Sequence, residues 1–188
     1  LEHLSEAGLS VLDLGLESAS HQQLISMKKT KNPQQYLDRA SKLIVKAFNL
    51  GIKVKINILL YAGETQKTLK ETEEWLEKHK MYITGVSVGP VTIYGWDEDT
   101  TAYVNDLETL GASIYRSSIG IKYLNLSPEI TFDESIEISK QLSQKFMTKE
   151  NFFFLKSFSY LPRDYKYEFF LKDLETIANK NDLSFSTN

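Results

Sequence analysis

Three apolar segments, separated by two segments with helical spacing, constrain the fold of this chain more than any other feature. They cover residues 11–17, 52–60 and 83–93. In the first two, apolar residues alternate with polar residues or glycine, which is the pattern of a β-strand. Strands joined through helices at this spacing form right-handed parallel crossover units. We therefore predict an α/β fold with a parallel sheet.

The first strand carries two acids on the side opposite its leucines, at Asp13 and Glu17. Because an unpaired buried charge is costly, we expect these acids to face a polar interior or a ligand. Ser20 and Gln23 have the spacing of a capping box for the next helix, so the turn after the strand is expected to be tight. Glu17 and Ser18 are then at the carboxyl end of the strand, where α/β proteins bind ligands.

The second strand repeats the same division. Lys53, Lys55 and Asn57 alternate with isoleucine and valine, whereas strands buried on both faces are usually apolar throughout. The polar set therefore predicts an interior that holds something. On the third strand, Ser87 and Gly89 leave room in that interior.

The helices between the strands begin at recognisable caps. Asn32 followed by Pro33 is a strong start for a helix that ends at Gly51. Thr65 is predicted to cap the helix that follows the second strand. Glu64 and Thr65 are expected to make only the turn and the cap.

Composition sets broad limits. The chain has 188 residues, a net charge of -3 and a pI of about 5.7, which suits one domain with an appended subdomain and gives no support for a nucleic-acid partner. No run is long enough to span a membrane, and we expect a cytoplasmic protein. The chain has no signal peptide and begins with Leu1, so we interpret it as a piece of a longer protein.

The absence of cysteine is the most restrictive number in the composition. It excludes disulfides, thiolate nucleophiles and cysteine-ligated zinc or iron–sulfur sites within these residues, and we predict no metal ligands in the chain.

The pattern changes after Tyr94, where a turn with an acidic run begins. We predict a sheet-forming part over residues 1–95 and a mostly helical extension over residues 96–188. The extension contains an aromatic segment at residues 151–160, which we expect to fold back on the sheet; a partner surface is the alternative.

One set of residues resembles a known family. It consists of Gly15-Leu16-Glu17-Ser18-Ala19-Ser20 followed by Leu24, Met27 and Lys29. This set resembles the fourth strand and following helix of radical S-adenosylmethionine (radical SAM) enzymes. Gly63-Glu64-Thr65 is also similar to the family, although Tyr61-Ala62 replaces the usual Leu-Pro before it. The resemblance continues to about residue 95 and then fades.

The resemblance implies a parallel βα half-barrel, corresponding to strands four to six of a six-stranded partial TIM-type barrel. It also implies a parent enzyme that binds a [4Fe-4S] cluster and S-adenosylmethionine and forms a 5′-deoxyadenosyl radical that abstracts hydrogen from a substrate. The cluster is held by a three-cysteine loop after the first strand of the barrel, which this chain lacks. The chain is therefore expected to be inactive alone, to contribute cofactor and substrate contacts, and not to hold the cluster.

The resemblance also implies cofactor contacts. Glu17 and Ser18 would lie at the cofactor, with the Glu17 carboxylate accepting hydrogen bonds from the ribose hydroxyls or the amino group. Lys29 would pair with the cofactor carboxylate, although Lys28 and Lys31 are close enough to be confused with it. On the second strand, Asn57 would contact the ribose. An ungapped alignment puts Ile56 there, but the strand alternation favours Asn57.

Further readings of these residues stay open. The same resemblance implies that Ser87 contacts the cofactor near its adenine. Glu17 could instead bind a neighbouring lysine and the helix N-terminus, and Lys29 could belong to a solvated cluster. Lys55 could pair with Asp13 or Glu17.

Two other functions are compatible with the sequence. Lys55 could be the Schiff-base nucleophile of a barrel-type lyase, with Asp13 or Glu17 as its acid–base partner. The chain could instead be a non-catalytic interaction module that uses Phe153 and Phe154. Self-association through exposed strand edges is a further expectation.

Overall fold

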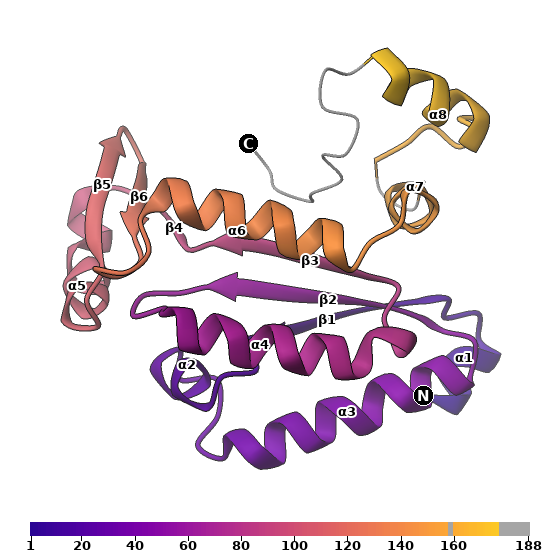
Figure 1. The fold of residues 1–188 in the computed structure, drawn as a ribbon, viewed down its shortest axis with the longest axis horizontal. Coiled ribbons are helices and arrows are strands. Elements are labelled where there is room, and N and C mark those ends of the chain that lie inside the picture. Colours follow the sequence, from indigo (N-terminus) through magenta and orange to yellow (C-terminus); the bar gives the residue numbers. More distant parts are fainter. Residues whose placement is uncertain (158–159, 177–188) are drawn as a thin grey trace.

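The computed structural model describes residues 1–157 and 160–176 (Figure 1). Within these residues the chain forms eight α-helices, one 3₁₀ helix and six strands. In chain order they are α1 (Glu2–Glu6), β1 (Val11–Glu17), α2 (His21–Ser26), α3 (Pro33–Asn49), β2 (Lys53–Leu60), α4 (Gln66–His79), η1 (Lys80–Tyr82), β3 (Gly85–Pro90), β4 (Thr92–Tyr94), α5 (Asp97–Thr109), β5 (Ser113–Ser118), β6 (Ile121–Asn125), α6 (Phe132–Lys145), α7 (Lys149–Ser157) and α8 (Tyr167–Thr176).

A three-stranded parallel sheet lies at the centre, in the order β1-β2-β3. The register pairs Asp13 with Lys55, and Asn57 with both Gly15 and Ser87. The predicted α/β class with a parallel sheet is confirmed. In Figure 1 the carboxyl ends of these strands point toward α2, α5 and the β5–β6 hairpin, whereas α1 and α7 lie near their amino ends.

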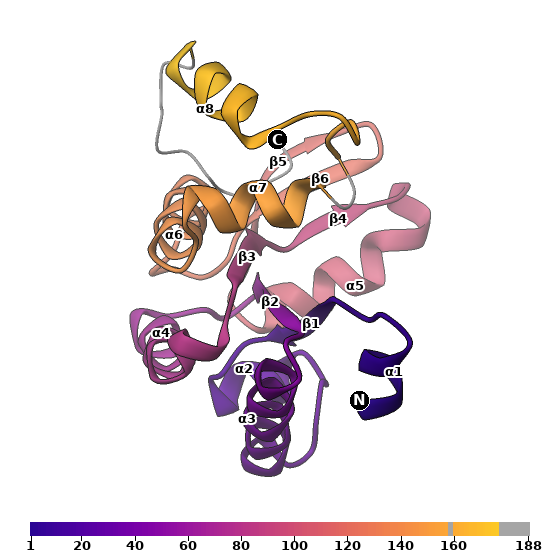
Figure 2. The same cartoon turned by 90° about the vertical axis from the view of Figure 1, so that its right-hand side faces the viewer.

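Strand β2 shows why the sheet has two unlike faces. Its side chains Val54, Ile56, Ile58 and Leu60 are at most 4% exposed. They form the face of the sheet that α3 and α4 cover, and Figure 2 shows both helices on one side of the sheet. The intervening residues Lys53, Lys55, Asn57 and Leu59 are partly or fully exposed. The predicted alternation is therefore confirmed, and Ile56 is completely buried on the helix-covered face.

Local capping chemistry sets the starts of the helices. The Asn32 side chain accepts a hydrogen bond from the Gln35 amide at 3.0 Å, and Pro33 occupies the first position of α3. Thr65 and Thr68 form a reciprocal capping box at α4. The predicted capping box of Ser20 with Gln23 is wrong, because the Ser20 side chain makes no cap hydrogen bond and Gln23 is fully buried.

The third predicted strand is two strands. Residues 85–90 form β3, whereas residues 92–94 form β4 and leave the parallel sheet after Val91. Strand β4 belongs to an antiparallel sheet in the order β4-β6-β5, which the sequence analysis did not predict. All six residues of its edge strand β5 are exposed, so this strand lacks the apolar alternation that predicts strands.

Helices α6 and α7 pack against β3. Ser135, Ser139 and Ser143 are fully buried along one side of α6, and side chains this small allow helix and strand to approach closely. A Cβ atom on Gly85 would lie 2.7 Å from Met147 and 2.8 Å from Leu155 of α7. The aromatic segment thus folds back on the sheet through Leu155, as expected, while Phe158 lies outside the described residues.

The sheet-forming part and the extension, whose boundary we predict at residue 95, are joined by hydrogen bonds, since β4 pairs with β6 of the extension. The division itself stays a prediction. In the described ranges, no helix combines the length and the apolar character that crossing a membrane requires.

Candidate functional site

The face of the parallel sheet opposite α3 and α4 carries most of the predicted site residues. We call it the polar face, and it consists of Asp13, Gly15, Lys53, Lys55, Asn57, Leu59, Gly85, Ser87 and Gly89, with the Glu17 carboxylate lying over Gly15. The register places Ser87 beside Asn57 at mid-sheet. No described atom lies within 4 Å of the position that a Cβ atom on Gly89 would take, so this end of the face is open.

The middle of the polar face is cross-linked between strands. The Lys55 ammonium lies 2.8 Å from the Asp13 carboxylate, and the Asn57 amide donates to the other oxygen of Asp13 at 2.5 Å. The salt bridge of Lys55 with Asp13, one of the two predicted partners, is confirmed. On this face, burial and the nearby charge of Lys55 lower the pKa of Lys156 in α7.

Glu17 has an unusual backbone conformation. Its φ of 67° is in the left-handed region, and the strand register shifts between Gly15 and Glu17. The Ser18 amide donates to the Leu16 carbonyl at 2.9 Å, which closes a three-residue turn centred on Glu17. A three-residue turn with positive φ at its centre is rare and strained. Such strain is often found at binding sites.

The turn brings the Glu17 carboxylate back over Gly15. A Cβ atom at Gly15 would lie 2.6 Å from the Glu17 Oε1 atom and 3.8 Å from the Lys29 ammonium nitrogen. A larger residue at this position would therefore displace the Glu17 carboxylate, whereas the backbone of Gly15 itself does not call for glycine. The Lys29 Nζ atom lies 3.3 Å from the same carboxylate oxygen.

The end of α2 explains how Lys29 reaches Glu17. Lys28 has a φ of 56°, and the amides of Lys28 and Lys29 donate to the carbonyls of Ile25 and Leu24, each at 2.9 Å. These are the two hydrogen bonds of a Schellman motif, which reverses the chain after a helix. Lys29 consequently points back to Glu17, while the Lys28 side chain is 88% exposed and lies 4.0 Å from Asp106.

Glu17 and Lys29 line a pocket of about 530 Å³ at the carboxyl ends of β1 and β2, which we call the carboxyl-edge pocket. Its wall comes from four parts of the chain: the end of β1, the end of α2, the end of β2, and α5 of the extension. The lining residues are Glu17, Ser26, Met27, Lys28, Lys29, Leu59, Tyr61, Tyr103, Asp106, Thr109 and Leu110.

Two tyrosines join the sheet to the extension in this pocket. The Tyr103 hydroxyl of α5 donates to the Tyr61 hydroxyl at 3.3 Å. Burial is the main cause of a strongly raised Tyr61 pKa, with the Tyr103 hydrogen bond and the Asp106 charge adding to it. Tyr61 is therefore a neutral phenol over the physiological range. The sequence analysis missed Tyr103 and Asp106, because nothing in the sequence of α5, a polar helix well beyond β2, indicates that it returns to the end of the sheet.

Ser18 is not in the pocket. It is 2% exposed, and its hydroxyl lies 3.1 Å from the Thr72 hydroxyl and accepts a hydrogen bond from the Ser20 amide. Glu17 and Ser18, which we expected to lie together at the cofactor, therefore point to different places. Glu17 faces the pocket, and Ser18 anchors the turn to α4.

A buried polar chain continues from Ser18 toward Glu64. The Thr72 hydroxyl donates to the Thr68 carbonyl, and the Thr68 hydroxyl donates to the Glu64 carboxylate at 2.5 Å. Glu64 is 2% exposed, and burial raises its pKa from 4.5 to about 7, although hydrogen bonds from Thr68 and the Tyr61 amide oppose the shift. The Glu64 carboxylate accepts these hydrogen bonds from the turn and from the first turn of α4, in keeping with its expected role, and Thr65 is the cap that was predicted.

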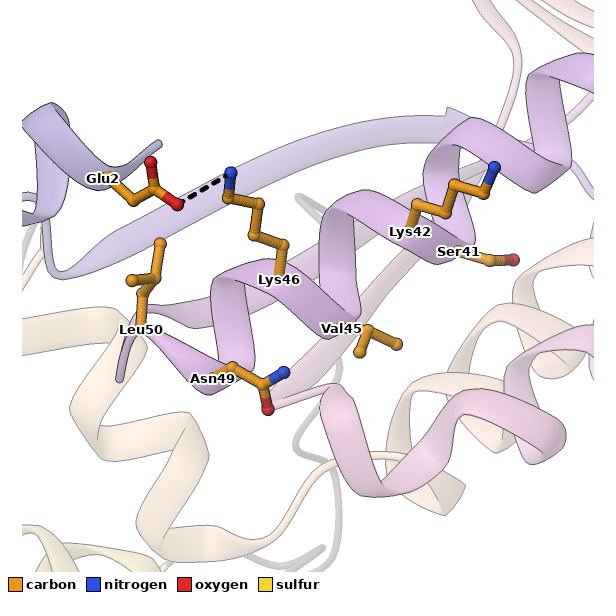
Figure 3. A pocket seen from close by; sticks show the side chains of 7 residues that line it. All are labelled: Glu2, Ser41, Lys42, Val45, Lys46, Asn49 and Leu50. Carbon is orange, nitrogen blue, oxygen red and sulfur yellow. Dashed lines mark ion pairs between the residues drawn. The ribbon is translucent and has the colours of Figure 1, made fainter.

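A second pocket, of about 490 Å³, lies along the outer side of α3 (Figure 3). Lys46 and Glu2 form an ion pair of 3.1 Å across one end of it. Its remaining lining residues come from α3 and from Leu50 at the end of that helix. This pocket shares no residue with the polar face or with the carboxyl-edge pocket, so it is not our candidate site.

Comparison of the chain with family models, with curated proteins and with solved structures gave no match. In the described part of the chain, no group of three or more histidine, cysteine, aspartate or glutamate side chains could hold a metal ion.

Proposed function

We propose that this chain is part of a radical SAM enzyme and that it supplies contacts to S-adenosylmethionine and to the substrate. The observation that carries the proposal is the Glu17–Lys29 pair. The strained turn and the adjacent glycine hold this pair at the carboxyl end of a parallel strand, in a pocket of about 530 Å³. The sequence resemblance through Gly15, Glu17, Met27 and Lys29 supports the same assignment.

The residues in the pocket have donor and acceptor properties that suit this cofactor. A carboxylate accepts hydrogen bonds from ribose hydroxyls and attracts an ammonium group, while a lysine attracts a carboxylate. Glu17 and Lys29 therefore match the two kinds of polar group on S-adenosylmethionine. Their side chains are 26% and 35% exposed, so a ligand can reach both. Bound and reduced, the cofactor supplies the radical that abstracts hydrogen from the substrate.

The finer architecture in this proposal is a half-barrel. The sheet ends at β1 on one side and at β3 on the other, and α6 packs against β3. Upstream strands would continue the sheet from β1, which is an edge strand among the described residues. The cysteine-free chain has no ligands for a [4Fe-4S] cluster, so the proposal assigns the cluster to those upstream residues.

Asn57 and Ser87 would be further contacts of the cofactor in this proposal. They are adjacent in register on the polar face, near the open end at Gly89. Ser18 has a different task here, since its hydroxyl already holds the turn that positions Glu17.

The proposal is tested by equilibrium dialysis of radiolabelled S-adenosylmethionine against the longer, cysteine-containing chain under anaerobic conditions. We expect saturable binding that weakens at least tenfold in Glu17→Gln, because a charge-assisted hydrogen bond contributes about 1.5–3 kcal/mol. Glu6→Gln is the matched control, since Glu6 lies in α1, near the amino ends of the strands and away from the carboxyl-edge pocket. Equal binding by Glu17→Gln and the unaltered chain would contradict the assignment.

The Schiff-base lyase is less well supported. Lys55 forms a 2.8 Å ion pair with Asp13, and an ion-paired ammonium must lose both its proton and its partner before it can attack a carbonyl group. Borohydride trapping of a carbonyl substrate on Lys55 would favour this alternative. For the interaction module, loss of a protein partner in a variant with Phe153 and Phe154 changed to aspartate would be the corresponding observation.

A further inference from the structure

The conformation of Glu17 needs an external support. A non-glycine residue with positive φ at the centre of a three-residue turn is strained, and such a residue persists only when its surroundings hold it. After the turn, the support is the Ser18 hydroxyl, which is bound to Thr72. Before the turn, at Gly15 and Leu16, the chain needs a second support.

The Tyr36 side chain contacts this part of the chain. Its hydroxyl lies 3.0 Å from the Gly15 carbonyl oxygen and 3.2 Å from the Leu16 carbonyl oxygen. The Leu16 oxygen is also the acceptor that closes the turn, through the Ser18 amide. One phenolic hydroxyl therefore contacts both peptide groups that immediately precede Glu17.

The sequence places Tyr36 there through the start of α3. Asn32 caps this helix and Pro33 opens it, so Tyr36 lies in the first helical turn, close to the carboxyl end of β1. The Tyr36 ring is half-buried against the main core. Burial and the charge of Glu17 raise the pKa of the Tyr36 hydroxyl, which keeps it a donor at neutral pH.

We propose that Tyr36 is a positioning residue, whose hydroxyl fixes the turn at Glu17 and thereby holds the Glu17 carboxylate over Gly15 and beside Lys29. Tyr36 does not itself touch a ligand in this assignment. Its effect on cofactor affinity rests on the proposed function, whereas its effect on the turn does not.

The test is Tyr36→Phe, which removes one oxygen atom and keeps the ring that packs against the core. The first readout is amide hydrogen exchange measured by NMR on this chain. Loss of one hydrogen bond should speed exchange of the Ser18 amide by roughly two- to tenfold, because the turn opens more often. Amides in the middle of β2, such as that of Ile56, should keep their rates. The carboxyl carbon of Glu17 should also shift, since the side chain leaves its place beside Lys29.

The matched control is Tyr82→Phe. Tyr82 packs edge-on against Phe48 with 5.3 Å between ring centroids, and it comes from η1, at the far end of α4 from the carboxyl-edge pocket. This variant should leave the Ser18 exchange rate and the Glu17 carbon resonance unchanged. Unchanged Ser18 exchange and an unchanged Glu17 resonance in Tyr36→Phe would overturn the positioning role, as would uniform acceleration over the whole sheet, which indicates only general destabilisation.

Binding of S-adenosylmethionine to the longer chain is the second readout. Tyr36→Phe should weaken binding roughly two- to tenfold, and it should have no further effect in a Glu17→Gln background. If the unaltered longer chain binds no cofactor, the proposed function fails while the exchange result still decides the role of Tyr36. If the unaltered chain binds and Tyr36→Phe weakens binding equally with and without Glu17, the positioning role fails and the function stands.

Discussion

The buried carboxyl group of Glu64 should make the stability of this protein depend on pH in an unusual direction. The group is 2% exposed, and burial raises its pKa from 4.5 to about 7. The folded chain therefore binds the Glu64 proton more tightly than the unfolded chain does. Below pH 4.5 both states are protonated at this residue, and it imposes no penalty on folding. As the pH rises from 4.5 through 7, the unfolded state ionises first and stability is lost.

The size of the loss follows from the shift. A difference of one pKa unit corresponds to about 1.36 kcal/mol, so a change from 4.5 to about 7 corresponds to about 3 kcal/mol once the pH exceeds both values. This amount is a large fraction of the stability of an ordinary domain, which is about 5–15 kcal/mol. Glu64→Gln removes the titration and keeps a side chain that can still accept the Thr68 hydroxyl.

The assay is urea unfolding followed by tryptophan fluorescence at several pH values between 4.5 and 8. Because other groups also titrate, the informative quantity is the free energy of unfolding of Glu64→Gln minus that of the unaltered protein. We expect this difference to rise by about 3 kcal/mol across the range, in favour of the variant at high pH. Glu74→Gln is the control, since Glu74 lies on the same helix with a side chain 67% exposed and 3.8 Å from Lys70. Its difference should stay within about 0.5 kcal/mol. A flat difference for Glu64→Gln would refute the reasoning.

Three further predictions concern the site and the fold. Gly15→Ala should displace the Glu17 carboxylate, because the new methyl group would lie 2.6 Å from Oε1; NMR of the Glu17 side chain should show the change, and an unaltered resonance would contradict the packing argument. Thr65→Ala should lower the free energy of unfolding by about 1 kcal/mol through loss of the α4 cap, whereas Thr101→Ala, at an exposed position of α5, should change it by less than about 0.5 kcal/mol. Leu76→Ala should cost about 2–5 kcal/mol because Leu76 is fully buried beneath the sheet, and a cost below 1 kcal/mol in urea unfolding would indicate that α4 is not packed as described.

The sequence was sufficient where the signal is local. Alternation in β2 predicted both the strand and its two faces, with Ile56 buried and Asn57 on the polar face, because a period of two needs only the residues of one strand. Adjacent strands with opposite charges also made the pair of Lys55 with Asp13 a natural expectation.

The parts that the sequence did not predict depend on distant contacts. The carboxyl-edge pocket includes Tyr103 and Asp106 only because the extension returns to the end of β2, which no local pattern encodes. Strand β5 was missed because all its residues are exposed and its polar residues follow no alternation. The contact of Lys29 with Glu17 depends on the Schellman motif, in which Lys28 takes a conformation that usually favours glycine.

The sequence does not predict which way the Ser18 side chain points. Its position next to Glu17 at the end of the strand is the same whether its hydroxyl faces a ligand or a neighbouring helix. The three-residue turn at Glu17 decides between these, because it sends Glu17 to the pocket and Ser18 to Thr72. A turn with positive φ at glutamate is not a pattern that propensities predict.

We propose above that the chain belongs to an enzyme whose upstream residues bind an iron–sulfur cluster and whose Glu17 contacts S-adenosylmethionine. The most direct measurement is the iron content and visible absorption of the longer chain after anaerobic reconstitution with iron and sulfide, before and after addition of S-adenosylmethionine. The account predicts about four iron atoms per chain, and a spectrum that changes on addition of the cofactor and changes less in Glu17→Gln. A longer chain without a cysteine triplet, or one that takes up no iron, would contradict the account.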